Sequence, residues 1–412
     1  MKPHQIERRL TRESKLSGGI TPNYHGFGLA NIMPTILSHY KAKHNQNILA
    51  PEVFDYELLR GAKTVVFLVI DGLGHYQLQH EWKTQDLHTH DALKEGHMSI
   101  ATSVLPSTTA TAMTTLGVGV TPQEHGFLGY SSWLPEHKVI MQMLAWKPLW
   151  GKLRQKIQLR KMQPLPTMAD RLHRAGVRCT NINRELFMHG SLSNMIRGNM
   201  DYVPYSTSAD LFVQARKYLS RNAGKKRFLH LYWDMFDHLS HVYGPNGAEA
   251  GEEIRMIDML LHENILRRQW KDTVLVVTAD HGHTTINPKQ VLRLKKHPTL
   301  VRNLAIPPYG EPRFMQLKPK KGKQEAVYEY CEKAFGKHAH VLLQEEALAL
   351  GLLGINKPAK HVSERLGDIL LLPKKNYAFG GGPTQGMTQL IGQHGSISKE
   401  EMLVPLMTVR LG

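Results

Sequence analysis

The sequence predicts an α/β fold in which a mostly parallel central sheet is flanked by helices. Short apolar runs rich in β-branched and aromatic residues alternate with segments of helical spacing, as in strands joined by helical crossovers. The strand-like runs are residues 64–70, 176–183, 227–233 and 272–279, and the clearest helical segment is 247–268. Because ligands bind at the carboxyl ends of parallel strands, we look for function there.

The composition changes after "DHGHTT" at residues 280–285. The following stretch is rich in lysine and proline and contains strand-like runs at 312–319 and 367–374, with a helical segment at 323–335 between them. The segment "GQHGSISKEEMLVPLMTVRL" then returns to strand-like texture. We therefore expect a catalytic core made of residues 1–287 and 383–412, with an inserted smaller α+β cap at 288–382.

The totals are those of a soluble globular protein, with 412 residues, 41% of them hydrophobic and 21% charged. The longest apolar run, 64–70, is too short to span a bilayer, and the polar first residues show no signal-peptide pattern. Cys179 and Cys331 are far apart and form no CxxC motif, which disfavours disulfides and thiolate metal sites. We expect a cytoplasmic protein without a transmembrane segment.

The balance of charge is basic, because 52 lysines and arginines face 35 acids, leaving a net charge of +17. Such a charge favours anionic partners, which include nucleic acids, lipid surfaces and small anionic substrates. The basic residues fall in short runs such as "GKKR" (224–227) and "KPKKGK" (318–323). No aromatic-rich RNA-binding pattern accompanies them, so nucleic-acid binding is only weakly supported.

Acids and histidines follow three of the predicted strands. Asp71 comes directly after the first, Asp280 and His281 after the fourth, and Asp237 and His241 lie four residues apart after the third, on one face of a helix. A parallel sheet would gather these groups at one edge, and His394 could reach the same edge. Each one alone has a structural explanation, as a turn residue or a strand cap. Together, three neighbouring carboxylates need cations, and carboxylate and imidazole ligands suit Zn²⁺ or Mn²⁺.

A nucleophile is indicated by "LPSTTATAMTTLGVGVTPQEHG" at residues 105–126. "PSTT" is a helix start, where backbone N–H groups and the helix dipole favour an anion. A threonine hydroxyl there would be placed to attack phosphorus. On local grounds alone, a simple N-cap is the more frequent role for such a residue.

These residues together resemble the alkaline phosphatase superfamily, and specifically its type I phosphodiesterase/nucleotide pyrophosphatase branch. The resemblance lies in an ordered series of motifs that spans roughly residues 60 to 400: "VIDGLG", "PSTTATAMTTLGVGVTPQEHG", "DHLSHVYGP", "TADHG" and "GQHGS". It covers the core and not the cap. It implies an alkaline phosphatase-like core and a metal-dependent hydrolase of phosphate esters.

The resemblance implies two metal sites, with Zn most expected and Mn the alternative. One consists of Asp237, His241 and His394 and would hold the hydrolytic water, and the other consists of Asp71, Asp280 and His281 and would hold the nucleophile. Counting back from the Gly-x-x-Pro-x-x-His-Gly element at 119–126 assigns that nucleophile to Thr109, with Thr108 and then Ser107 as fallbacks.

Some positions depart from the family pattern or lie outside it. Tyr130 stands where the family has a phosphate-binding asparagine, so a tyrosine hydroxyl would have to donate that hydrogen bond. Asp234 and His238 match no family ligand and are expected to support the site or lie on the surface. Arg313 and Lys318 of the cap are basic residues with the reach to contact a phosphate, but the sequence assigns them no role.

The function that we expect is hydrolysis of phosphodiesters or nucleotide pyrophosphates through a covalent phospho-threonine intermediate. A cytoplasmic phosphomonoesterase or a phosphonate hydrolase on the same site is the alternative enzyme. A nucleic-acid or anionic-surface binding protein that uses the positive charge is the alternative of another class, and a structural metalloprotein is the third.

Overall fold

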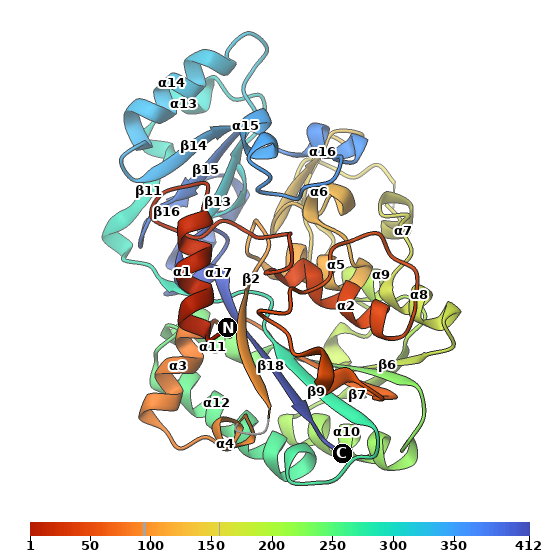
Figure 1. The fold of residues 1–412 in the computed structure, drawn as a ribbon. Coiled ribbons are helices and arrows are strands. Elements are labelled where there is room, and N and C mark those ends of the chain that lie inside the picture. Colours follow the sequence, from red (N-terminus) through yellow and green to blue (C-terminus); the bar gives the residue numbers. More distant parts are fainter. Residues whose placement is uncertain (94–95, 156) are drawn as a thin grey trace.

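The computed structural model describes residues 1–93, 96–155 and 157–412. A seven-stranded sheet runs through the middle of the molecule, with helices on both faces and a smaller sheet beside it (Figure 1). The order of its strands is β2 (His97–Thr102), β18 (Leu403–Arg410), β9 (Thr273–Thr278), β1 (Thr64–Ile70), β8 (Arg227–Trp233), β6 (Arg178–Arg184) and β7 (Asp201–Tyr205).

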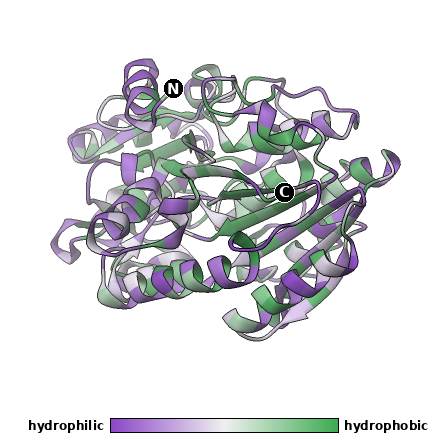
Figure 2. Cartoon of the chain, turned by 60° about the horizontal axis from the view of Figure 1, so that its bottom comes forward, coloured by the Kyte–Doolittle hydropathy of each residue, from purple (hydrophilic) through white to green (hydrophobic). Residues whose placement is uncertain are grey.

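The five strands from β9 to β7 are parallel, whereas β18 is antiparallel to both of its neighbours, β2 and β9. The expected α/β fold with a mostly parallel sheet is therefore confirmed. All seven residues of β1 are buried, because helices cover both faces of the sheet. Figure 2 shows this as hydrophobic strands in the middle of the molecule, surrounded by helices of mixed character.

The two faces of the sheet bury separate hydrophobic cores. Val65, Phe67 and Val69 of β1 belong to one core, and the alternate residues Val66 and Leu68 belong to the other. The first core includes residues of α1 (Pro3–Glu13), α2 (Ile32–His39), α5 (Thr109–Val118) and α8 (Met168–Arg174). The second includes residues of α3 (His75–Thr84), α10 (Ser208–Arg221), α12 (Ala248–Leu261) and the π-helical turn η4 (His262–Leu266).

A four-stranded antiparallel sheet lies within the segment expected to form the cap, in the order β12 (Tyr309–Glu311), β13 (Phe314–Leu317), β15 (Ile369–Pro373) and β14 (Ala339–Leu343). Helices α13 (Pro298–Arg302) and α14 (Gln324–Phe335) contribute to its hydrophobic core. The outer limits proposed for the cap, residues 288 and 382, stay a prediction. The remaining helices of this part are α15 (Gln344–Ala349) and α16 (Lys360–Arg365).

Smaller elements connect these parts. A three-stranded sheet of β3 (Ser131–Leu134), β4 (Val139–Gln142) and β5 (Lys147–Trp150) packs its first two strands against α9 (Ser191–Arg197). Two-stranded pairs join β10 (Thr284–Thr285) to β17 (Gly392–Gln393), and β11 (Val291–Arg293) to β16 (Ala378–Gly380). Short helices are α4 (His88–Ala92), α6 (Pro122–His125), α7 (Leu159–Met162) and α17 (Lys399–Met402), and α11 (Met235–Tyr243) follows β8 directly.

Candidate active site

Three of the predicted metal ligands meet at the carboxyl ends of two neighbouring strands. Asp71 follows β1, and Asp280 and His281 follow β9, which pairs with β1 in parallel. The backbone amides of Gly72 and His281 each donate to Asp280 Oδ1 at 3.0 Å, which fixes that carboxylate. The potential ligand atoms of Asp71, Asp280 and His281 lie within 4.8 Å of one another.

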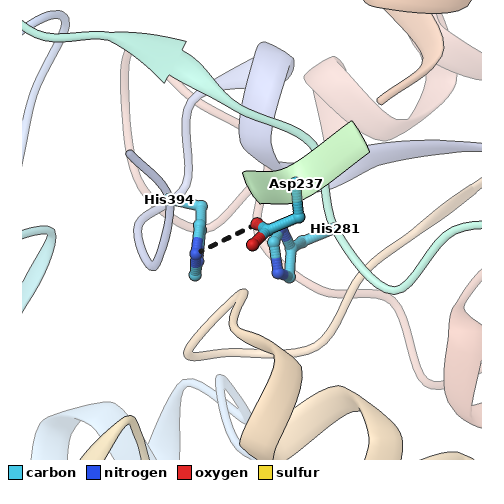
Figure 3. Close-up of side chains that lie close together, drawn as sticks. All are labelled: Asp237, His281 and His394. Atoms are coloured by element: carbon cyan, nitrogen blue, oxygen red, sulfur yellow. Dashed lines mark ion pairs between the residues drawn. The ribbon is translucent and has the colours of Figure 1, made fainter. Parts of the chain in front are cut away.

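The other three predicted ligands lie beside this group. Asp237 and His241 occupy one face of α11, and His394 lies just after β17. Asp237 Oδ1 is 3.5 Å from His241 Nε2 and 3.8 Å from His394 Nε2. Figure 3 shows Asp237, His281 and His394 converging on one point from separate segments. The rings of His281 and His394 stack with centroids 3.8 Å apart, so the two predicted sites adjoin.

The hydrogen bonds of the three predicted histidine ligands determine where each ring carries its proton. In each ring Nδ1 faces a backbone carbonyl oxygen: His281 faces Gly282 at 3.1 Å, His241 faces Gly392 at 2.7 Å and His394 faces Ser107 at 3.0 Å. A carbonyl oxygen can only accept, so the proton is on Nδ1. In the neutral ring each Nε2 therefore presents a lone pair to the carboxylates, whereas a protonated ring donates to Asp237 and lowers its pKa.

With neutral rings, the carboxylate oxygens and the imidazole lone pairs of the cluster face one another, and both are hydrogen-bond acceptors. Burial, followed by the charges of Asp280 and Asp237, holds the pKa of Asp71 well above its usual range. Burial also acts to raise the pKa of Asp237, but the neighbouring imidazoles, His241 foremost, hold it well below its ordinary value. Among the described residues Asp280 Oδ2 has no hydrogen-bond partner, and it is buried 3.4 Å from His281 Nε2. Cations would supply the positive charge that these lone pairs lack.

Thr109 presents its hydroxyl to this cluster. It is the first residue of α5, with Thr108 as the N-cap. Its Oγ1 lies 3.1 Å from His281 Nε2 and 3.4 Å from Asp71 Oδ1. Ser107, by contrast, donates to the carbonyl of Ser396 at 2.8 Å and is turned away from the acids. The helix start thus brings one hydroxyl, at the positive end of the helix dipole, into the group of acids and histidines.

Other residues considered in the sequence lie around the site or away from it. The hydroxyl of Tyr130 accepts from Gln142, while its amide donates to Glu311 at 3.3 Å, and its predicted contact with phosphate stays a prediction. Asp234 pairs with Arg184 at 2.8 Å, and both Asp234 and His238 line a cavity next to the acids. The two basic cap residues make ion pairs: Arg313 is buried against Glu401 and Lys318 pairs with Asp368.

Comparison with known proteins agrees with this geometry. The family model described as type I phosphodiesterase/nucleotide pyrophosphatase matches residues 65–397. The chain belongs to this family. The match includes all six predicted metal ligands and Thr109, since they lie between Asp71 and His394.

Curated relatives within the ectonucleotide pyrophosphatase/phosphodiesterase group match over shorter stretches. Human family member 7 is 34% identical over 124 residues, which cover 28% of this chain and 26% of the relative. Human family member 5 is 27% identical over 150 residues, covering 34% of this chain and 29% of the relative. The matched stretches thus span only about a quarter to a third of those proteins.

Solved structures show the same fold over most of the chain. Murine ectonucleotide pyrophosphatase/phosphodiesterase 5 superposes with a TM-score of 0.63 at 20% identity, covering 83% of this chain and 87% of the other. Phosphonoacetate hydrolase from Sinorhizobium meliloti 1021, solved with phosphonoformate, gives a TM-score of 0.63 at 18% identity, with coverages of 84% and 90%. These likenesses confirm the alkaline phosphatase-like architecture.

His283 is part of the site, but the sequence motifs did not identify it. Its side chain is fully buried, and its Nε2 lies 2.9 Å from Asp237 Oδ1, whereas its Nδ1 has no hydrogen-bond partner within residues 1–93, 96–155 and 157–412. Burial lowers the pKa of His283 to about 4, so the ring is neutral at pH 7 and its single proton is on Nε2. His283 therefore donates to Asp237, whereas the three predicted ligands present lone pairs. The only signal in the sequence was the second histidine of "DHGH".

Two further site residues, Tyr232 and Glu311, lie in segments that contain no motif. The hydroxyl of Tyr232, near the end of β8, donates to Asp71 Oδ2. Glu311, at the end of β12, lies with Oε2 3.8 Å from His394 Nδ1. Burial raises the pKa of Glu311 to about 8. Neither residue could be recognised from spacing, because each reaches the site through strand packing alone.

Proposed function

We propose that this protein is a metal-dependent hydrolase of phosphate esters, with phosphodiesters or nucleotide pyrophosphates as substrates, that works through a covalent phospho-threonine intermediate. One observation carries the proposal. The Thr109 hydroxyl adjoins a cluster of three carboxylates and three imidazoles, with Oγ1 3.1 Å from His281 Nε2 and 3.4 Å from Asp71 Oδ1. Family membership supports the same chemistry.

The residues present fit two divalent ions, with zinc the first choice and manganese the alternative. The donor set consists of carboxylates and neutral imidazoles, which both metals accept. Asp280 Oδ2, which is buried and has no hydrogen-bond partner in the described part of the chain, is an acceptor that a cation would satisfy. In our assignment Asp71, Asp280 and His281 hold one ion, and Asp237, His241 and His394 hold the other. When bound, such ions neutralise the carboxylates and stabilise negative charge on the attacking and departing oxygens.

The residues of the chain have distinct roles in this proposal. Thr109 Oγ1 forms the bond to phosphorus while the bond to the leaving oxygen breaks. The leaving group takes up the proton of the Thr109 hydroxyl and departs as an alcohol from a diester or as a phosphate from a pyrophosphate. A water molecule then attacks the phospho-threonine, releasing the phosphate product and restoring the Thr109 hydroxyl. The start of α5 places this oxygen where backbone N–H groups favour negative charge. Tyr232 orients Asp71 and His283 orients Asp237 through their hydrogen bonds.

Hydrolysis of a phosphonate is the second candidate function. The superposition with phosphonoacetate hydrolase, solved with phosphonoacetate and with phosphonoformate, is the observation that favours it. The same hydroxyl and acids would serve, and the substrate would differ in the group attached to phosphorus. A phosphomonoesterase differs from a phosphodiesterase and from a phosphonate hydrolase in its substrate, which carries a single ester bond to phosphorus.

The decisive experiment compares turnover of bis(4-nitrophenyl) phosphate, 4-nitrophenyl phosphate and phosphonoacetate. Wild type, Thr109→Ala and Thr108→Ala are each stripped of metal and re-supplied with Zn²⁺ or Mn²⁺. We expect metal-dependent diester turnover that falls at least about a thousandfold in Thr109→Ala. Thr108→Ala is the comparison, because Thr108 is the neighbouring N-cap residue and its hydroxyl hydrogen-bonds to Glu311, whereas that of Thr109 faces Asp71 and His281.

Other outcomes would redirect the proposal. Full activity of Thr109→Ala together with loss of activity in Thr108→Ala would move the nucleophile to Thr108. Preference for the monoester or for phosphonoacetate would keep the site and change the substrate. If no ester is hydrolysed with either metal, while nucleic acid binds with a steep salt dependence, the hydrolase proposal is wrong and the positive charge becomes the functional feature.

A further inference from the structure

A cavity of about 470 Å³ opens beside the acids and the candidate nucleophile. Asp71, Thr109 and Asp237 form part of its lining. Residues of α5, α9, β6 and β8 also line it. Its volume is in the range of pockets that enclose a small organic ligand, which is about 300–1,000 Å³. A phosphate at Thr109 would therefore leave room for a large substituent.

The lining of this cavity is mainly apolar. Helix α5 contributes Met113 and Leu116, α9 contributes Leu192 and Ile196, and the sheet side contributes Phe67 and Phe228. Phe67 and Phe228 stack on each other with centroids 6.2 Å apart. Methionine, leucine and isoleucine side chains present flexible hydrocarbon surface, which suits a ligand of the same kind.

Several polar side chains of the lining are engaged with protein partners, although Asp234 Oδ1 is buried without a hydrogen-bond partner among the described residues. His230 Nδ1 and Asn181 Oδ1 are hydrogen-bonded at 3.0 Å, and Asp234 forms its ion pair with Arg184. The guanidinium of Arg197 stacks over the ring of Tyr202, 5.0 Å from its centroid. A nucleoside would have to compete with these partners for hydrogen bonds to its base and ribose, whereas a hydrocarbon chain needs none of them.

The outer end of the cavity is also apolar. Leu186, which is 75% exposed, and Leu144, which is 37% exposed, belong to the lining. Large aliphatic side chains left in water at the rim of a pocket mark a surface that gains free energy when an apolar ligand covers it. The apolar track thus extends from Thr109 to the surface.

We propose that the natural substrates of this site are phosphate esters that carry a long hydrocarbon chain, with the phosphate at Thr109 and the chain in this cavity. The inference rests on the proposed function for the position of the phosphate, and on the cavity for the nature of the substituent. Each methylene that enters the cavity should tighten binding about fourfold, the equivalent of about 0.8 kcal/mol of burial.

The test measures binding, so that it does not depend on turnover. Methyl-, butyl- and octylphosphonate and AMP are titrated calorimetrically into Thr109→Ala protein supplied with Zn²⁺. We expect affinity to rise roughly 250-fold from butyl- to octylphosphonate, which differ by four methylenes, and to exceed that for AMP. Equal affinity for methyl- and octylphosphonate, or tighter binding of AMP than of octylphosphonate, would overturn the inference.

Two matched variants test whether the hydrocarbon chain of the ligand lies in the cavity. Leu186→Asp introduces a charge at the rim, at a position exposed enough for the fold to tolerate it, and should weaken octylphosphonate binding about tenfold. Met259→Asp makes the same change on α12, where Met259 is 50% exposed and lies outside the lining, and should leave binding unchanged. Equal losses in the two variants would show that the chain binds elsewhere.

Failure of the cavity proposal and failure of the hydrolase proposal give different results. Metal-dependent diester turnover without any dependence on chain length would keep the hydrolase and remove the hydrocarbon substrate. A strong dependence of binding on chain length, in a wild-type protein that hydrolyses no ester, would keep the cavity as a binding site for hydrocarbon chains and remove the hydrolase.

Discussion

Four histidines crowd around Asp237 and Asp280, and hydrogen bonding divides them into two kinds. Three have Nδ1 against a backbone carbonyl, so their Nε2 atoms present lone pairs. His283 is the exception, because its Nε2 donates to Asp237. Gly72 makes room for this contact: at φ +75° it adopts a left-handed conformation, and a Cβ there would lie 2.7 Å from His283 Nε2. His283 is therefore a positioning residue in our proposal.

His283→Met tests this role, since methionine fills a similar volume and cannot donate a hydrogen bond. The carboxylate of Asp237 would lose its orienting partner, so affinity for Zn²⁺ should fall about 10- to 100-fold. The measurement is a competition titration against a chromophoric chelator. His80→Met, at an exposed position of α3, is the control and should bind Zn²⁺ like the wild type. An unchanged affinity in His283→Met would mean that Asp237 is held without it.

At the scale of single residues, the sequence predicted which acids and histidines lie together in the site, but it did not predict the residues that contact and orient them. Asp71, Asp280 and His281 could be found because strand ends and short motifs mark them. Tyr232 looked like an ordinary aromatic residue of a buried strand, and only the parallel register with β1 brings its hydroxyl to Asp71. Glu311 lies in a segment read as cap, and its closeness to His394 depends on packing between distant parts of the chain.

Among the elements, α5 carries the candidate nucleophile and is held in place by the short helix α6 behind it. His125 of α6 is buried and links the two helices: its Nε2 lies 3.0 Å from Thr115 Oγ1, and its Nδ1 accepts from the amide of Phe127 at 3.1 Å. Thr115 in turn donates to the carbonyl of Thr111. Both ring nitrogens are satisfied only when the imidazole is neutral.

The neutral state of His125 predicts a loss of stability in acid. Burial, and then the neighbouring His361, lowers the pKa of His125 from 6.5 to about 3. Between about pH 6.5 and pH 3, His125 is therefore protonated in the unfolded chain and neutral in the folded protein. The stabilising contribution is complete above about pH 6.5 and is lost as the pH falls towards 3, with about 2 kcal/mol lost by about pH 5.

His125→Gln is the test, with the free energy of unfolding measured by urea denaturation at several pH values. The variant should be less stable than the wild type at neutral pH, and the difference should shrink as the pH falls to about 5. His173→Gln, at an exposed position of α8, provides the comparison and should keep the pH dependence of the wild type. A constant difference between His125→Gln and wild type would contradict the proposed neutral histidine.

The elements found from the sequence are those with strong local patterns. Strand β1 has the predicted limits, 64–70, and α14 follows the predicted 323–335 within one residue. The sequence did not predict the antiparallel edge of the central sheet, formed by β2 and β18, because nothing in residues 97–102 or 403–410 indicates which strands they pair with. The three-stranded sheet of β3, β4 and β5 was missed too, because its strands of four residues are too short to show a period.

At the scale of the whole molecule, a buried ion pair joins the smaller sheet to the core. Arg313, in the turn between β12 and β13, donates from Nε to Glu401 Oε1 at 2.9 Å, and neither side chain has solvent exposure. Glu401 of α17 also accepts from the amide of Ser396 at 3.0 Å, two residues after His394. The same carboxylate thus ties the smaller sheet to the loop that carries a proposed metal ligand.

Breaking this pair from one side should be expensive, because an uncompensated charge would stay buried. Arg313→Met is expected to lower the free energy of unfolding by about 3–5 kcal/mol. The double variant Arg313→Met/Glu401→Gln removes both charges and should recover a large part of that loss. Thermal and urea unfolding of the three proteins measure it. A double variant no more stable than Arg313→Met would show that packing, and not charge, is the main contribution of these side chains.

The central sheet has a gap until its last strand arrives. β18 lies between β2 and β9, and about 300 residues separate the end of β2 from its start. At roughly 5–20 residues per second, a ribosome takes about 15–60 s to cross that interval. Once β9 has been made, the nascent chain carries two unpaired strand edges, on β2 and on β9, which are open to association with other chains. Its dependence on chaperones during synthesis should therefore peak just before residues 403–410 emerge, when nearly all of the apolar surface has been made and the sheet is still open.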